Sequence, residues 1–211
     1  MSSSAGSPSA GLKHVRMGEM VASRTADDVL TVVGLGSCVA LVLCCPERGA
    51  AALAHVVLPD SDMTRGREAP PAKFANTAVP ALVSALRRYR VKPDQLTAYL
   101  VGGSSMFGLS PKSKLAGVGD RNVEAVKREL KLLGIPVAGE DVGGEHGRSI
   151  QVNVGECRVM SKSGTEELID VGPSKSSKFQ TRNGKTTEQA ASDALAAASA
   201  FADSVNGRLI A

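Results

Sequence analysis

The sequence predicts an α+β protein in which layered, mixed β-sheets pack between helices. Short apolar runs bounded by Gly and Pro, typical of buried strands, recur between residues 29 and 161. Two other segments carry apolar residues at helical spacing. Several strands follow one another without an intervening helix, which argues against a sheet built from regular alternation of strands and helices.

The first predicted strands come from "DDVLTVVGLGSCVALVLCC" (27–45) and "GAAALAHVVLP" (49–59). A glycine-containing turn divides the first stretch, and "PERG" separates it from the second. The uncharged run 29–45 is interrupted by Gly34 and Gly36 and is shorter than the roughly 20 residues of a membrane-spanning helix. We therefore expect buried strands and no membrane insertion.

The remaining elements follow a polar loop at 60–73. We expect Asn76 to cap a first helix, and a second to run from near Asp120 to a stop at Gly134. The segments "LTAYLV" (96–101), "IPVAGEDV" (135–142) and "RSIQVNVGECRVMS" (148–161) complete the predicted strands, with a glycine turn at 143–147.

Composition changes at both ends of the chain. Residues 1–17 are predicted to be a polar, flexible N-terminus, and 18–163 the folded domain. Residues 164–185 are basic and polar, as in a linker, and 186–211 form an Ala-rich helix or tail. Residues 1–11 contain no apolar leader, so we expect a cytoplasmic protein.

Charge and composition exclude several classes of function. The 25 basic and 21 acidic residues are spread along the chain, and only six residues are aromatic, which argues against nucleic acid as a partner. The four cysteines have no paired spacing of the kind that binds zinc. We expect no metal, no cofactor and no disulfide framework.

Cys38 is the candidate nucleophile. The glycines before it allow a tight turn whose backbone N–H groups could stabilise a thiolate and later an oxyanion. A base is also needed, and pairing of successive strands would bring His55 toward Cys38. From residue types alone the alternative stays open that Cys38 is a buried thiol and His55 a satisfied core histidine.

Six segments occur in the order and spacing of a known family. They are "GLGSCVALVL", "AALAHVVLPDS", "KFANTAVPALVSAL", "LVGGSSMF", "GDRNVEAVKRELKLLGIPV" and "EDVGGEHGRSI". Over residues 29–161 the chain resembles the chemoreceptor glutamine deamidases of the CheD family.

The resemblance implies an amidohydrolase of bacterial chemotaxis. Its fold would be a cysteine-hydrolase fold similar to the catalytic domains of the cytotoxic necrotizing factors. Cys38 would be the nucleophile and His55 the base, converting glutamines of methyl-accepting receptor helices to glutamate and releasing ammonia. It also implies a second partner, the CheC-type chemotaxis phosphatase. An alternative reading is a binding module for that phosphatase with weak or lost catalysis.

One position departs from the family pattern. The family places a threonine six residues before the nucleophile, where this chain has Val32. Thr31 lies one position earlier, and on a strand it would face the other way unless a bulge intervenes. Thr31 and Ser37 remain the candidates to orient His55 or to help bind the oxyanion, and a backbone carbonyl could orient His55 in their place.

Two further segments are candidates for substrate contacts. The loop "DVGGEHGRSI" is either a tight turn or a wall of the substrate cleft. In the second case Gly143, Gly144 and Arg148 are candidates to line the cleft, and Arg148 is available for acidic groups on a receptor helix. "TEQAAS" (187–192) resembles a receptor modification site. Gln189 is thus a candidate tethered pseudosubstrate, the alternatives being an ordinary Ala-rich helix packed on the domain or a disordered tail.

Overall fold

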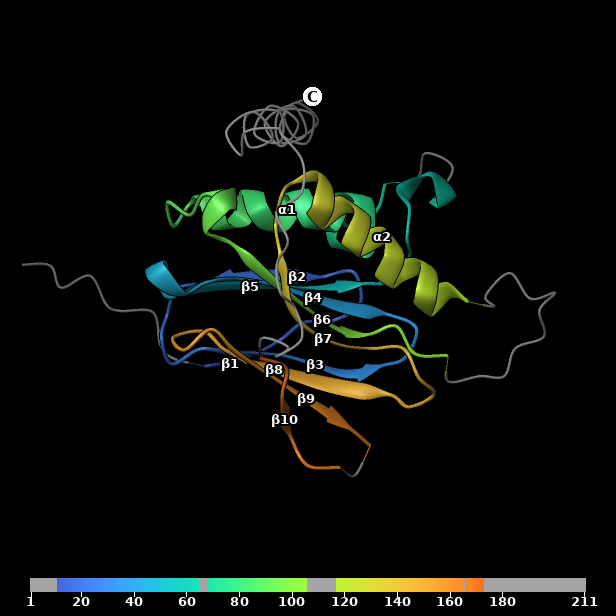
Figure 1. Cartoon of the computed structure of the whole chain (residues 1–211). Coiled ribbons are helices and arrows are strands. Elements are labelled where there is room, and N and C mark those ends of the chain that lie inside the picture. The colour runs from blue at the N-terminus through green and yellow to red at the C-terminus, as the bar shows by residue number, and fades with distance from the viewer. Residues whose placement is uncertain (1–10, 65–67, 106–116, 165, 173–211) are drawn as a thin grey trace, which may run out of the picture.

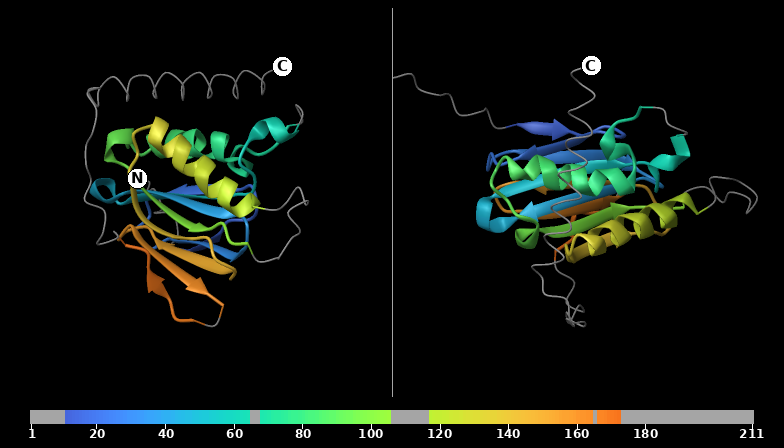
Figure 2. Two further views of the ribbon diagram at one scale, coloured as in Figure 1. Left: turned by 45° about the vertical axis from the view of Figure 1, so that its right-hand side comes forward. Right: turned by 90° about the horizontal axis from the view of Figure 1, so that it is seen from above.

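The computed structural model describes residues 11–64, 68–105, 117–164 and 166–172. Two five-stranded sheets stack face to face, and two helices cover the outer face of one of them (Figures 1 and 2). The result is a three-layer arrangement of helices, inner sheet and outer sheet. No helix within these described ranges is both long and apolar enough to cross a membrane.

The inner sheet has the strand order β2-β5-β4-β6-β7. Every neighbouring pair is antiparallel except β6 and β7, which run parallel, so the sheet is mixed as predicted. Its strands are β2 (Met20–Ser23), β4 (Val39–Cys45), β5 (Ala50–Val56), β6 (Thr97–Gly102) and β7 (Val137–Val142).

The outer sheet has the order β1-β3-β8-β9-β10, with only the β1–β3 pair parallel. Its strands are β1 (Leu12–His14), β3 (Val29–Leu35), β8 (Arg148–Asn153), β9 (Arg158–Ser163) and β10 (Ile169–Asp170).

Two α-helices, α1 (Ala75–Arg87) and α2 (Val118–Leu132), lie on the inner sheet. Asn76 does not cap α1, because the cap position is Phe74. The Asn76 side chain instead bonds the loop after β5, accepting from the backbone N–H of Ser61 and donating to Asp60 Oδ1 at 3.1 Å each. Four short 3₁₀ turns complete the described elements: η1 (Pro46–Arg48), η2 (Ser61–Thr64), η3 (Pro71–Lys73) and η4 (Pro93–Gln95).

Strands β4 and β5 are buried along their whole length, because helices cover one face of the sheet and the outer sheet covers the other. Side chains of β4 alternate between two apolar layers. Leu41 and Leu43 face the helices, whereas Ala40, Val42 and Cys44 face the outer sheet. This alternation decides where the side chains at the start of β4 point.

A buried carboxylate anchors the N-terminal strands. Asp28 accepts hydrogen bonds from the backbone N–H of Gly11 and from the side chains of Lys13 and Ser23. Burial acts to raise the pKa of Asp28, but these hydrogen bonds outweigh it and hold the pKa below its usual value. Asp28 therefore stays ionised and ties together the segments that carry β1, β2 and β3.

The folded unit is longer at both ends than expected. Strand β1 lies within the segment predicted to be flexible (1–17), and Val15 next to it is only 2% exposed. Strand β10 pairs with β9 inside the predicted linker (164–185), and Val171 is buried. The predicted Ala-rich helix at 186–211, with Gln189, lies outside the described residues.

Candidate functional site

Cys38 lies immediately before β4 and continues its alternation. Its half-buried side chain packs against the apolar layer between the two sheets, together with Ala40 and Val42. The thiol therefore faces the outer sheet and not the helices. Burial raises the pKa of the Cys38 thiol, so at neutral pH the resting side chain is protonated and needs a base.

His55 lies on the neighbouring strand and on the same face. In the antiparallel β4–β5 pair, His55 is opposite Ala40, two positions along from Cys38. Diagonal neighbours of this kind lie about 7–8 Å apart at the backbone, within reach of a long or aromatic side chain. The predicted pairing of these strands is thus confirmed, and it brings the two candidate residues to one site.

His55 is held in the protonation state that a general base requires. Only 4% of the residue is exposed, and neither ring nitrogen makes a hydrogen bond within the described part of the chain. Burial lowers the pKa of His55. The adjacent backbone of Val15 acts to raise this pKa, and electrostatic repulsion from His14 lowers it further. The neutral imidazole can therefore accept a proton at pH 7.

The loop before Cys38 is held by its carbonyl groups. The carbonyl of Gly36 accepts from the backbone N–H and hydroxyl of Ser104, at 2.8 and 3.0 Å. The carbonyl of Cys38 accepts from the N–H of Gly103 at 2.7 Å. Among the described residues no partner accepts from the N–H groups of Ser37 and Cys38, so these remain available for an oxyanion.

Thr31 does not face His55. The bulge in β3 lies after Val32, so it leaves the alternation at Thr31 unchanged. Leu30 and Val32 point into the layer between the sheets, and the Thr31 hydroxyl donates to the carbonyl of Ile150 at 2.8 Å. The side chain at the expected threonine position is therefore the apolar Val32.

The Ser37 side chain is exposed beside Cys38, and its hydroxyl makes no hydrogen bond to another described residue. The backbone of Ser37, in contrast, is bonded to the rest of the fold: its carbonyl accepts a 2.8 Å hydrogen bond from the side chain of Asn122.

The glycine loop adjoins this region, but its arginine is already engaged. Gly143 N–H donates to the carbonyl of Gly102, and the carbonyl of Gly144 accepts from Ser105. Arg148 donates through Nε to Asp141 at 2.8 Å and through Nη1 to the carbonyl of Gly143 at 2.7 Å. With 12% of its side chain exposed, Arg148 supports the loop, contrary to the expectation of a free cation for a receptor helix.

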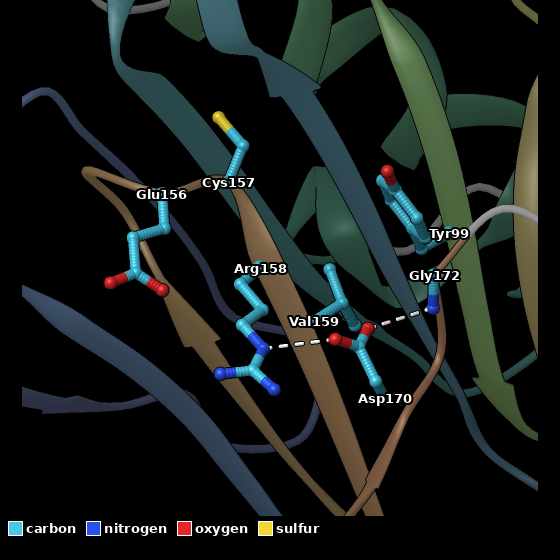
Figure 3. Close-up of a pocket in the computed structure, with 7 residues that line it drawn as sticks. All are labelled: Tyr99, Glu156, Cys157, Arg158, Val159, Asp170 and Gly172. Atoms are coloured by element: carbon cyan, nitrogen blue, oxygen red, sulfur yellow. Dashed lines mark hydrogen bonds and ion pairs between the residues drawn. The ribbon is translucent and has the colours of Figure 1, made fainter.

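No metal-binding cluster forms among the described residues, where no three His, Cys, Asp or Glu side chains gather as a metal site requires. A cavity of about 300 Å³ lies elsewhere, lined by residues of β6, β9 and β10 and of the turn before β9. Figure 3 shows its lining, with the Arg158–Asp170 ion pair along one wall and Cys157 above it. None of the predicted site residues lines this cavity.

Comparison with known proteins identifies the family. The family model described as CheD chemotactic sensory transduction matches residues 57–163. A probable chemoreceptor glutamine deamidase CheD from Symbiobacterium thermophilum is 42% identical over 149 residues, 71% of this chain and 90% of that protein. The chain belongs to the CheD family. The chemoreceptor glutamine deamidase CheD of Thermotoga maritima is 40% identical over 158 residues, covering 74% of this chain and 96% of that one.

A CheD relative from Bacillus subtilis, also named a chemoreceptor glutamine deamidase, is 42% identical over 130 residues, 62% of this chain and 78% of that protein. Among solved structures, YlmD from Geobacillus stearothermophilus is 15% identical with a TM-score of 0.37, covering 60% of this chain and 56% of that chain.

Sequence reasoning missed the residues that shape the loop of this CheD chain. Gly102 and Gly103 both have positive φ, and a Cβ on either would meet neighbouring atoms at once. The glycine pair in "LVGGSS" was the available signal, because adjacent glycines after a strand mark a close approach of backbones. Nothing in the sequence pointed to Ser104 or Asn122.

Proposed function

We propose that this chain deamidates glutamine side chains of methyl-accepting chemotaxis receptors, with Cys38 as nucleophile and His55 as general base. The observation that carries the residue assignment is their common face: both side chains lie between the sheets, on paired strands, next to N–H groups with no described partner. The names of the CheD relatives support the reaction and the substrate.

The proposed mechanism uses this geometry. Neutral His55 takes the thiol proton, and Cys38 Sγ bonds to the glutamine carboxamide carbon to form a tetrahedral oxyanion. The N–H groups of Ser37 and Cys38 stabilise that oxyanion. Its collapse breaks the C–N bond, and protonated His55 gives its proton to the departing ammonia. Water, activated by His55, then cleaves the thioester, leaving glutamate and restoring the thiol.

The proposal extends to the fold family of the enzyme, its compartment and a second partner. The layered mixed sheets would belong to the cysteine-hydrolase fold, as in the cytotoxic necrotizing factor catalytic domains. The protein would act in the cytoplasm, where receptors carry the modified helices, and a CheC-type phosphatase would be a second partner.

A second candidate function is a binding module for that phosphatase with weak catalysis. The observation that favours it is the environment of His55. Its ring nitrogens have no hydrogen-bond partner within the described ranges. The layer between the sheets, on the face to which His55 belongs, contains the apolar Val32 where a hydroxyl would be needed. A His55 that no side chain orients would be a slower base.

Intact-mass analysis of a receptor cytoplasmic fragment separates the two functions. Incubation with the wild-type protein should add about one dalton per converted amide, and the Cys38→Ser protein should add nothing. A fragment that binds both proteins equally and gains no mass with either would overturn the enzymatic proposal.

The pseudosubstrate hypothesis for Gln189 needs a separate comparison. Because Val171 is buried, a truncated chain should end after Gly172 and not at the predicted boundary of 163. Faster deamidation by the truncated chain would support the hypothesis. Equal rates, with Gln189 unmodified in the full chain, would contradict it.

A further inference from the structure

A single buried amide joins the two segments that carry the candidate catalytic residues. Asn122 lies in α2 and is fully buried. Its Nδ2 donates to the carbonyl of Ser37 at 2.8 Å and to the carbonyl of Val57 at 3.0 Å. Ser37 directly precedes Cys38, and Val57 lies two residues after His55.

Packing alone does not account for an asparagine at this position. The Oδ1 atom of Asn122 is buried without a hydrogen-bond partner in the described part of the chain. An unpaired buried acceptor lowers stability, and an alanine or leucine would cover the same helix face without that loss. The two carbonyl contacts of Nδ2 are therefore the interactions that distinguish asparagine from an apolar residue here.

The contact to Ser37 determines the direction of the next N–H group. In a trans peptide unit the C=O and N–H groups point in opposite directions. The Ser37 carbonyl points toward α2, on the helix side of the inner sheet, so the Cys38 N–H points toward the other side. That is the side to which the Cys38 thiol and His55 belong. Ser104 acts likewise on the preceding peptide unit, through the carbonyl of Gly36.

We propose that Asn122 is a positioning residue that sets the oxyanion hole by holding the Ser37 carbonyl, and that ties this loop to the strand carrying His55. The inference rests on the proposed deamidation by Cys38. Asn122 touches no reacting atom; it acts through the Cys38 N–H and through the spacing of the Cys38 and His55 backbones.

The test compares three variants of the full chain with the wild type. Asn122→Ala removes the amide, and Asn122→Asp keeps its shape but presents only acceptors to the two carbonyls when ionised. Val126→Ala, one turn along α2 and equally buried, is the control for loss of packing alone. Thermal unfolding identifies a temperature at which all four proteins are folded, and kinetics on a receptor fragment are measured there.

Both Asn122 variants should lower kcat by about 10- to 100-fold with KM changed by less than about threefold, because an oxyanion contact acts in the transition state. Alkylation of Cys38 by iodoacetamide near pH 8 should slow in the same variants, because the N–H dipoles also stabilise the thiolate. Val126→Ala should leave both rates close to wild type.

The inference is overturned if the wild type deamidates the receptor fragment and Asn122→Ala has the same kcat as the wild type. It is also overturned if Val126→Ala lowers kcat as much as Asn122→Ala does. A wild type that shows no Cys38-dependent deamidation would instead refute the proposed function. The alkylation rates then decide the role of Asn122 by themselves, since they need no receptor: unchanged alkylation in both Asn122 variants would overturn it.

Discussion

Replacing Gly102 by alanine tests whether the end of β6 sets the position of Cys38. Gly102 has φ +109°, and a Cβ built on it would lie 2.4 Å from the carbonyl oxygen of Cys38. Real Cβ atoms essentially never approach closer than 3.0 Å, so the two backbones must separate. The carbonyl of Cys38 belongs to the loop that carries the thiol, and the substitution therefore moves the thiol as well.

The size of the effect follows from that distance. Going from 2.4 to 3.0 Å requires a shift of at least about 0.6 Å, and a misplacement near 1 Å lowers rates by about 100-fold. We expect kcat to fall by about 10- to 100-fold, and the free energy of unfolding to fall by about 1–3 kcal/mol from backbone strain. Gly134→Ala is the matched control, because Gly134 has φ +68° but nothing within 4 Å of its added Cβ.

The assay is the time course of receptor deamidation by intact mass, alongside urea denaturation of both variants. Gly134→Ala should lose about 1 kcal/mol of stability and keep its kcat. Equal kcat for the two variants, at similar stability, would refute the argument that contact with β6 positions Cys38.

Three further predictions concern the N-terminal anchor, the base and its orientation. Asp28→Ala should lower the free energy of unfolding, measured in urea, by about 2–3 kcal/mol, because it leaves buried donors unpaired. Asp27→Ala, at an exposed position, should change it little. Equal losses in the two variants would contradict the anchoring role of Asp28. The pKa of His55 is lowered by burial, so the unfolded chain binds this proton more readily: stability should be full above pH 6.5 and fall as pH drops below it. His55→Gln should lack the part of this loss of stability that comes from His55. Identical pH profiles of unfolding for His55→Gln and the wild type would contradict the lowered pKa of His55. Val32→Thr should raise kcat several-fold by offering His55 a hydroxyl, and should lower the free energy of unfolding by about 1 kcal/mol. Thr31→Val should leave kcat unchanged, because the Thr31 hydroxyl bonds the carbonyl of Ile150. The reverse pattern would identify Thr31 as the residue that orients His55.

Local pattern was enough to predict the central hairpin. The runs at 39–45 and 50–56 are apolar apart from His55 and are bounded by Gly and Pro, so they form strands buried on both faces. Because neighbouring strands pair, Cys38 and His55 were predicted to meet, and the β4–β5 register confirms the pairing. The same alternation places Cys44 and Cys45 on opposite faces of the sheet.

The ends of the domain and the state of Arg148 could not be predicted. Strand β1 has only three residues, two of them polar, and it forms because it pairs with β3 and Asp28 anchors it. Strand β10 has only two residues, both exposed, and forms through pairing with β9. Arg148 is engaged because Asp141, on another strand, comes within hydrogen-bond distance. Each of these features depends on a partner segment that the local pattern around the feature does not reveal.

The sequence by itself determined the residue types of the candidate site and the strand that carries His55, because strand periodicity and hairpin pairing are local properties. The register of that hairpin, seen only in the structure, puts His55 and Cys38 on one face. Only the tertiary structure decided how the Cys38 loop is held. Its carbonyls meet Ser104 and Asn122, which are 68 and 85 residues away from their partners in the chain. Such contacts follow from how β6 and α2 pack on the sheet, and hydrogen bonds to backbone atoms leave no periodic signal in the sequence.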